Sequence, residues 1–138
     1  MSLPYFNISA GQKKSFRRKL IAWYSEHARD LPWRNTNDPY AILVSEMMLQ
    51  QTQVDRVIPK FESFMKQFPT VKVLATAPSG KIIAAWQGLG YNRRALYLQK
   101  CAQTVTEQYS GVFPQTREEL LQLPGIGPYT AGALDNWP

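Results

Sequence analysis

The stretch that decides the fold is LPGIGPYTAGA, residues 123–133. It holds two glycines in a Gly-x-Gly spacing, Gly125 and Gly127, with one proline before them and Pro128 directly after. Glycine lets the backbone lie bare, because no β-carbon blocks a close approach. Amide groups at the start of the following helix can then donate to a phosphate oxygen. A short hairpin of this kind is equally consistent with a helix–helix corner without a ligand, and the fuller motif favours phosphate binding.

Upstream of this hairpin, hydrophobic residues recur at three- and four-residue steps, which predicts helices almost throughout. The expected helices cover about 11–28, 39–49, 53–68, 71–77, 80–87, 92–109, a segment from the Thr116–Glu119 capping box to Leu123, and a last one from Pro128. Asp38, Thr70 and Ser79 are expected to cap three of them, and Pro59 to kink one or mark its start. No stretch alternates as a strand would, so the sequence predicts an all-α fold.

Composition indicates one hydrophobic core and an anionic partner. The 138 residues suffice for a single core, and no apolar run approaches the roughly 18 residues that span a membrane. Without a signal-peptide pattern, we expect a cytoplasmic protein with no membrane partner. Sixteen Lys and Arg against ten Asp and Glu give a net charge of +6, which suits nucleic acid but also an ordinary solvated surface. The single cysteine, Cys101, cannot form an internal disulfide or supply a metal site alone.

Several polar side chains could carry chemistry or read bases. The apolar run 42–49 favours an exposed position for Glu46, whereas a position facing a cleft would raise its pKa and make it a general acid. The polar run 50–53 could read base edges or form an ordinary loop. Tyr91 follows two glycines, so its ring could wedge between bases or complete the core. The arginines at 93–94 could meet phosphates or only water.

Together these segments closely resemble the adenine DNA glycosylases of the MutY type, which remove adenine mispaired with 8-oxoguanine. The matching stretches are LPWRNTNDPYAILVSEMMLQQTQV (31–54), FPTVKVLATAP (68–78), WQGLGYNRRALYLQKCAQ (86–103) and LPGIGPYTAGA (123–133). The resemblance implies the six-helix core of the helix-hairpin-helix, endonuclease III-like glycosylase fold, with an incomplete second domain. It assigns residues 1–29 to an N-terminal helix of the family's iron–sulfur domain. It assigns residues 30–138 to the six-helix core, which is expected to end in a helix-hairpin-helix at 116–137.

The resemblance also implies roles for single residues. Glu46 matches the glutamate that protonates the flipped adenine and assists its departure. Gln51 and Thr52 match residues that contact the lesion strand near 8-oxoguanine. Leu89 and Tyr91 match a wedge beside that base.

Further roles concern the adenine pocket and the type of reaction. Trp33 and Arg34 fall in the loop that shapes the pocket, and Val54 borders it. The hairpin glycines match those that grip a phosphate. Tyr129 lines the active site where lyase-active endonuclease relatives carry a lysine. Without that amine no Schiff base with the sugar can form, which disfavours a lyase mechanism.

The second carboxylate that the chemistry needs is not expected in this chain. Removing adenine leaves an oxocarbenium-like sugar, which calls for an acid on the base and an anion near the sugar. The family's aspartate follows the hairpin by more than a helix length, and Asp135 lies too close to replace it. The four cysteine ligands of the family's iron–sulfur cluster are absent as well, so we expect no cofactor and no metal. The chain is therefore expected to be a truncated adenine glycosylase with little or no activity.

Two alternatives stay open: a non-catalytic module that recognises duplex or mismatched DNA, and a glycosylase for another mismatch, such as thymine opposite guanine. The expected partner is double-stranded DNA, carrying mispaired adenine in the first reading. In the family, the N-terminal helix packs with helices that follow the hairpin. We therefore expect its face with Phe16, Leu20 and Trp23 to self-associate, or the helix to be displaced. We expect a bacterial, nucleoid-associated protein.

Overall fold

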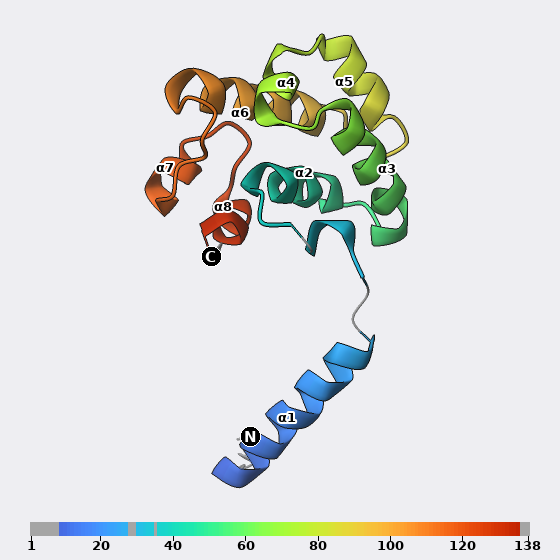
Figure 1. Cartoon of the computed structure of the whole chain (residues 1–138), viewed down its shortest axis with the longest axis vertical. Coiled ribbons are helices and arrows are strands. Elements are labelled where there is room, and N and C mark those ends of the chain that lie inside the picture. Colours follow the sequence, from blue (N-terminus) through green and yellow to red (C-terminus); the bar gives the residue numbers. More distant parts are fainter. Residues whose placement is uncertain (1–8, 28–29, 35, 136–138) are drawn as a thin grey trace, which may run out of the picture. The chain divides into compact units, whose positions relative to one another are not determined.

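The computed structural model describes residues 9–27, 30–34 and 36–135, and every regular element in these ranges is helical (Figure 1). In chain order the elements are α1 (Ala10–His27), the 3-10 turn η1 (Pro32–Arg34), α2 (Pro39–Leu49), α3 (Val54–Gln67), α4 (Val71–Thr76), α5 (Ser79–Trp86), α6 (Arg93–Gln108), α7 (Arg117–Leu121) and α8 (Pro128–Asp135). The expected all-α fold is confirmed. The chain divides into two compact units, residues 1–30 and 31–138.

The first unit contains α1. Its start is fixed by a capping box that the sequence reading missed: the Ser9 amide donates to Gln12 Oε1 at 2.9 Å, and the Gln12 amide donates to Ser9 Oγ at 3.2 Å. Phe16, Leu20 and Trp23 are 65%, 51% and 58% exposed. The helix therefore carries an apolar face that is open to solvent.

The second unit is built around α2. This helix is hydrophobic on almost every side, and seven of its residues, including Val44 and Met48, are buried. A helix that is apolar all round must be covered on all sides. It packs against η1, α3, α6 and α8, while α6 also packs on α4 and α5, and α7 packs on α8 (Figure 1). Phe64 of α3 and Trp86 of α5 are fully buried in the same core, and their ring centroids lie 5.9 Å apart in an edge-to-face arrangement.

Side-chain caps set the starts of several helices where the sequence predicts them. Asp38, Thr70 and Thr116 each accept a hydrogen bond from a backbone N–H of the first turn, at distances between 3.0 and 3.3 Å. These bonds satisfy amides that have no partner within the helix. Prolines at the first positions of α2 and α8 lose nothing there, because a first-turn amide has no intrahelical acceptor.

One local expectation is wrong, and half of another is excluded. Ser79 does not cap α5, because it is the first helical residue and the cap position is Pro78. The Ser79 hydroxyl instead donates to Gln99 Oε1 at 2.9 Å, a tertiary contact between α5 and α6. Pro59 does not mark the start of α3, since the helix begins at Val54 and the proline lies inside it. A kink at Pro59 stays a prediction.

The core assignment predicts unequal effects of the same substitution at two sites. Phe64→Ala should lower the free energy of unfolding by about 3–5 kcal/mol, because the ring is fully buried against Phe68 and Trp86 and its loss leaves a cavity. Phe16→Ala, on the exposed face of α1, should change it by less than about 0.5 kcal/mol. Urea unfolding followed by circular dichroism measures both. Similar losses from the two variants would contradict this core.

Candidate nucleic-acid interface

One side chain, Arg94 on α6, joins the two loops that hold the predicted base-contacting residues. Its Nη1 donates to the carbonyl oxygens of Met47 at 2.6 Å and Met48 at 3.3 Å, and also to that of Gln50. These carbonyls lie at the carboxyl end of α2, where the helix offers no amide to bind them. Arg94 thus caps α2 from a neighbouring helix.

The other terminal nitrogen of Arg94 holds the second loop. Its Nη2 donates to Thr52 Oγ1 at 3.2 Å and to the carbonyl oxygens of Leu89 and Gly90 at 3.3 and 3.2 Å. The Thr52 hydroxyl donates in turn to the Leu89 carbonyl at 3.3 Å. Burial lowers the pKa of Arg94, yet an arginine remains charged near neutral pH. The sequence predicts that Arg94 meets a phosphate or water. The structure instead turns its guanidinium group toward the protein.

These bonds shape the loops into conformations that side chains rarely adopt. Gln51 and Tyr91 lie in the left-handed region, with φ of +61° and +50°. Each such residue costs about 1 kcal/mol or more and persists when its surroundings impose it. Both line one open cavity of about 540 Å³. Its other lining residues are Gln50, Arg93, Arg94 and Tyr97.

The four residues predicted to contact DNA from these loops therefore differ in position. Gln51 is exposed, and Tyr91 is 67% exposed, so both side chains are available to a ligand. Thr52 is engaged with Arg94 and the Leu89 carbonyl. Leu89 is only 5% exposed and belongs to the core. Contact of Thr52 or Leu89 with DNA stays a prediction.

The two glycines of the hairpin differ in how far the protein itself requires them. Gly125 has φ of +76°, and a β-carbon there would lie 2.9 Å from Cβ of Tyr97, so both conformation and space demand glycine. At Gly127 a β-carbon would meet nothing within 4 Å. Leu123 and Ile126 bury the apolar side of the turn and fix it to the core. The backbone around Gly127 consequently stays bare toward solvent, as a phosphate site requires.

Glu46 is neither fully exposed nor fully buried. It lies on α2 between two buried neighbours, Ser45 and Met47. Burial raises the pKa of its carboxyl above the ordinary value, and no other carboxylate of the described residues contributes to this shift. A raised pKa keeps a glutamate protonated to higher pH, which is the state a general acid needs. The exposed position favoured by the sequence pattern is therefore not what is found.

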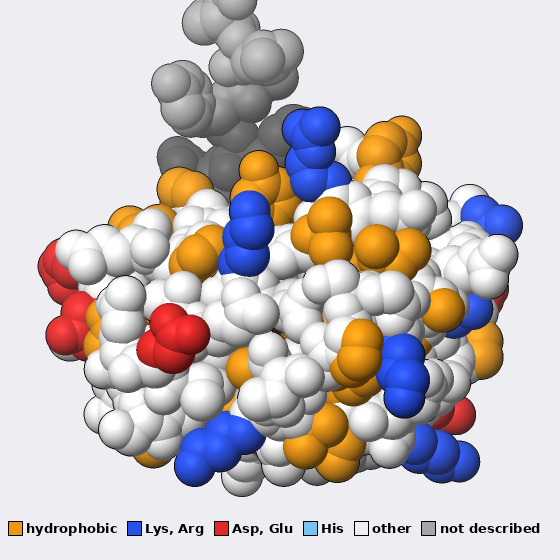
Figure 2. Space-filling model, turned by 90° about the horizontal axis from the view of Figure 1, so that it is seen from above, with side chains coloured by type: hydrophobic (Ala, Val, Ile, Leu, Met, Phe, Trp, Pro, Cys, Tyr) orange, Lys and Arg blue, Asp and Glu red, His pale blue; other side chains and the backbone are white. Residues whose placement is uncertain are grey.

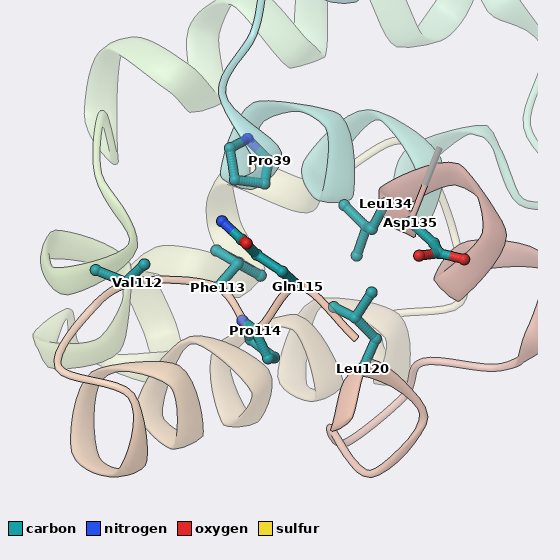
Figure 3. Close-up of a pocket in the computed structure, with 8 residues that line it drawn as sticks. All are labelled: Pro39, Val112, Phe113, Pro114, Gln115, Leu120, Leu134 and Asp135. Atoms are coloured by element: carbon teal, nitrogen blue, oxygen red, sulfur yellow. The ribbon is translucent and has the colours of Figure 1, made fainter. Parts of the chain in front are cut away.

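The last described residue, Asp135, lies in a different place. It lines a cavity of about 440 Å³ between the start of α2, the segment after α6 and the end of α8 (Figure 3). Pro39, which borders the same cavity, is seven residues from Glu46, about 10 Å along the helix axis. Asp135 thus belongs to a cavity whose lining does not include Glu46.

The residues predicted for the adenine pocket lie around η1 and the start of α3. The Trp33 ring packs edge-on against Phe61 at 5.4 Å, Arg34 ends η1, and Val54 is the first residue of α3. A pocket formed by them stays a prediction. Tyr129 is 81% exposed on the first turn of α8 and lines a cavity of about 400 Å³.

The described residues contain no group of three or more His, Cys, Asp or Glu side chains that could hold a metal ion. Cys101, the one cysteine of the sequence, is buried. The absence of a cofactor stays a prediction. No helix in the described part of the chain has the length and apolar character needed to cross a membrane.

A bare glycine hairpin between two helices, beside loops with exposed glutamine and tyrosine side chains, is typical of helix-hairpin-helix proteins that bind a phosphate backbone. Residues 44–134, about two thirds of the chain, match the HhH-GPD superfamily of base excision DNA repair proteins. The chain belongs to this superfamily.

Individual relatives support the resemblance to adenine DNA glycosylases. The chain is 42% identical over 120 residues to that of Buchnera aphidicola (86% of this chain, 34% of that protein), 44% over 129 residues to the human one (87% and 24%), and 44% over 117 residues to that of Mycolicibacterium smegmatis (84% and 40%). The predicted resemblance is confirmed. The chain spans about a quarter to two fifths of the length of these relatives.

Solved structures confirm the endonuclease III-like fold. A thermostable thymine-DNA glycosylase superposes with a TM-score of 0.81 at 31% identity, covering 94% of this chain and 61% of that one. Endonuclease III in a trapped covalent intermediate with DNA gives a TM-score of 0.75, covering 94% and 60%, and its 19% identity speaks for the fold alone.

We call the hydrogen bonds from Arg94 to the two loops the Arg94 clamp. The clamp predicts that lysine cannot replace Arg94. Lysine keeps the charge but lacks the planar fork that reaches both loops at once. Arg94→Lys should lower the free energy of unfolding by about 1–3 kcal/mol, because partly buried carbonyl oxygens lose their donor. The neighbouring Arg93→Lys, at an exposed position, is the matched control and should cost less than about 0.5 kcal/mol. Wild-type stability of Arg94→Lys in urea would rule out the clamp.

The raised pKa of Glu46 predicts a pH-dependent gain in stability on removing its charge. The folded state binds the proton of Glu46 more tightly than the unfolded state, whose value is near 4.5. Wild type should therefore lose stability relative to Glu46→Gln as pH rises from below 4.5 to neutrality, and the two should converge at low pH. Unfolding curves at a series of pH values test this, with Glu62→Gln on the exposed side of α3 as control.

Proposed function

We propose that this chain provides the recognition core of a DNA glycosylase that hydrolyses the N-glycosidic bond of adenine mispaired with 8-oxoguanine or guanine in double-stranded DNA. One observation carries the proposal: a half-buried carboxyl, Glu46, lies on α2, which leads into one of the loops that Arg94 holds and packs beside the bare glycine hairpin. The similarity to adenine DNA glycosylases at 42–44% identity supports adenine as the base.

In this proposal the target adenine leaves the base stack before it reacts. An enzyme cannot reach the bond inside a duplex, so it extrudes the nucleotide and fills the gap. Gln51 and Tyr91, exposed on the clamped loops, suit the filling and reading of that gap. Glu46 donates a proton to the departing adenine, and the pocket residues are Trp33, Arg34 and Val54. Tyr129 supplies no amine, so water completes the reaction and no Schiff base forms.

We further propose that the 138-residue chain by itself binds DNA without excising adenine. The sugar cation that develops as adenine leaves needs an anion beside it. Glu46 has no carboxylate neighbour that contributes to its pKa, and Asp135 lines a separate cavity. Both observations support a site with an acid but without its companion.

A single-turnover assay tests these proposals directly. The substrate is a duplex with adenine opposite 8-oxoguanine, and binding is measured in the same samples. Binding without release of adenine is the expected result. Release that is lost in Glu46→Gln would establish the glycosylase and disprove the proposed inactivity of this chain. Absence of binding to any duplex would contradict the function as a whole.

Gly127→Ala separates phosphate binding from folding. A β-carbon at Gly127 meets no protein atom, so stability should change by less than about 0.5 kcal/mol. DNA affinity should fall by about tenfold or more, because the added methyl group blocks the approach of a phosphate to the backbone. Gly80→Ala on α5, where a β-carbon also has open space, is the control and should leave affinity unchanged. Fluorescence anisotropy with a labelled duplex gives both affinities, and equal values would contradict the hairpin's role.

A second candidate is release of thymine opposite guanine. The superposition on a thymine-DNA glycosylase at 31% identity favours it. A third reading, a non-catalytic module for mismatched DNA, predicts binding in every variant of the assay and turnover in none. Parallel assays on a guanine–thymine duplex, with the released base identified, distinguish the three. All three require access to chromosomal DNA, so we propose that the protein works at the nucleoid.

We also propose that two copies of the chain associate through α1. The exposed Phe16, Leu20 and Trp23 lie on one apolar face of this helix, and water contact with such a face is unfavourable. Light scattering coupled to gel filtration should give a dimer mass at high concentration, and Phe16→Ser with Leu20→Ser should shift it to the monomer. A monomer at all concentrations would exclude this association.

A further inference from the structure

We propose that the exposed side of α6 that carries Arg93, Tyr97 and Lys100 binds the phosphate backbone of duplex DNA beyond the base-reading loops. We call these three residues the α6 stripe. The inference rests on the proposed function, because it takes DNA as the ligand. It extends the interface along α6, from the loop cavity that Arg93 and Tyr97 also line to the second cavity that Lys100 borders.

The spacing of the α6 stripe suits a polyanion. Positions 93, 97 and 100 are four and three residues apart, so they share one side of a helix. Arg93 and Lys100 are seven residues apart, about 10 Å along the axis at 1.5 Å per residue. One DNA strand carries a charge about every 3.4 Å of axis, so the two cations can reach phosphates roughly three nucleotides apart.

Tyr97 makes the stripe continuous with the rest of the interface. Its Cβ is the atom against which Gly125 of the hairpin packs. Its side chain is 40% exposed and borders the cavity that Gln51 and Tyr91 line. On its other side it borders a second cavity of about 390 Å³ together with Arg93 and Lys100. The same tyrosine therefore connects the hairpin, the base-reading loops and the stripe.

The second cavity has a fixed polar floor and a basic rim. Gln99 accepts from the Ser79 hydroxyl at 2.9 Å and donates to the carbonyl oxygen of Ala77 at 2.7 Å, and Gln103 donates to that of Ala75 at 3.2 Å. These amides are engaged within the protein. None of the residues that line the cavity is acidic. The cations at its rim are thus the charged groups that it presents to a ligand.

The charges along α6 run against the preference of the helix dipole. Arg93 is its first residue and Glu107 lies in its last turn, whereas a helix favours anions at its start and cations at its end. An external phosphate near Arg93 offsets this unfavourable arrangement. In the face shown in Figure 2, basic side chains are scattered over the surface, and acidic ones lie toward its two edges, mostly at the left.

Lys100 is also held in place for this role. Its Nζ lies 5.7 Å from the centroid of the Tyr97 ring, within the range of a cation–π contact. No acidic partner pairs with Lys100 or Arg93 among the described residues. A partly ordered ammonium group loses less conformational freedom when it binds a phosphate.

The test compares Arg93→Gln, Lys100→Gln and the double variant with Lys66→Gln, an exposed control on α3 that removes the same charge. Anisotropy titrations use a mismatched duplex and a fully paired duplex at several salt concentrations. Each stripe variant should weaken binding about threefold to tenfold on both duplexes, and should lower the slope of log affinity against log salt by about one. Lys66→Gln should match wild type. Unfolding in urea verifies that every variant is folded.

A second arm locates the contact on the DNA. Duplexes are shortened step by step from either flank, and the deficit of the double variant should vanish once one particular flank is removed. Wild-type binding with no deficit in the stripe variants would overturn the inference and leave the proposed function intact. A deficit confined to the mismatched duplex would also overturn it, since that pattern indicates base reading. Failure of wild type to bind any duplex would instead reject the proposed function.

Discussion

The hydrogen bonds of the Arg94 guanidinium are the constraint on which the candidate site depends. A planar group with donors in a fixed fork can serve the end of α2 and the loop before α6 at once. Both segments would otherwise present carbonyl oxygens without donors at a helix end and in a turn. Gln51 and Tyr91, both in left-handed conformations, directly follow Gln50 and Gly90, whose carbonyl oxygens accept from Arg94. The exposed site therefore follows from an inward-facing charge.

The clamp is in turn supported by the core. The Arg94 guanidinium lies 5.5 Å from the centroid of the Trp86 ring and 5.8 Å from that of Tyr91, so an aromatic group flanks it in the core and another near the surface. Trp86 is fully buried and packs on Phe64. The aromatic core thus supports the Arg94 guanidinium, and the guanidinium in turn holds the two loops. Strain at a functional site persists where a rigid structure supports it.

Local signals in the sequence were sufficient for the helices and the hairpin, and insufficient for contacts between them. Asp38, Thr70 and Thr116 act on their own helices, so a reading of neighbours in sequence finds them. Ser79 carries the same chemistry but bonds to a distant helix, which no local pattern reveals. The direction of the Arg94 side chain likewise depends on where the carboxyl end of α2 lies in the folded protein. The partial burial of Glu46 depends on neighbouring helices, because its own helix is apolar on nearly every side.

The net charge of +6 is a weaker argument for DNA than the location of the charges. Five of the sixteen basic residues lie in KKSFRRK, residues 13–19, a segment of α1 outside the hairpin unit. In the second unit the hairpin contributes backbone amides and no charge, since amides can fix a phosphate at one position. Two exposed cations on α6 add attraction that is long-ranged but nonspecific. In the proposed function, base reading falls to the uncharged side chains of Gln51 and Tyr91, so attraction, positioning and recognition would come from different chemical groups.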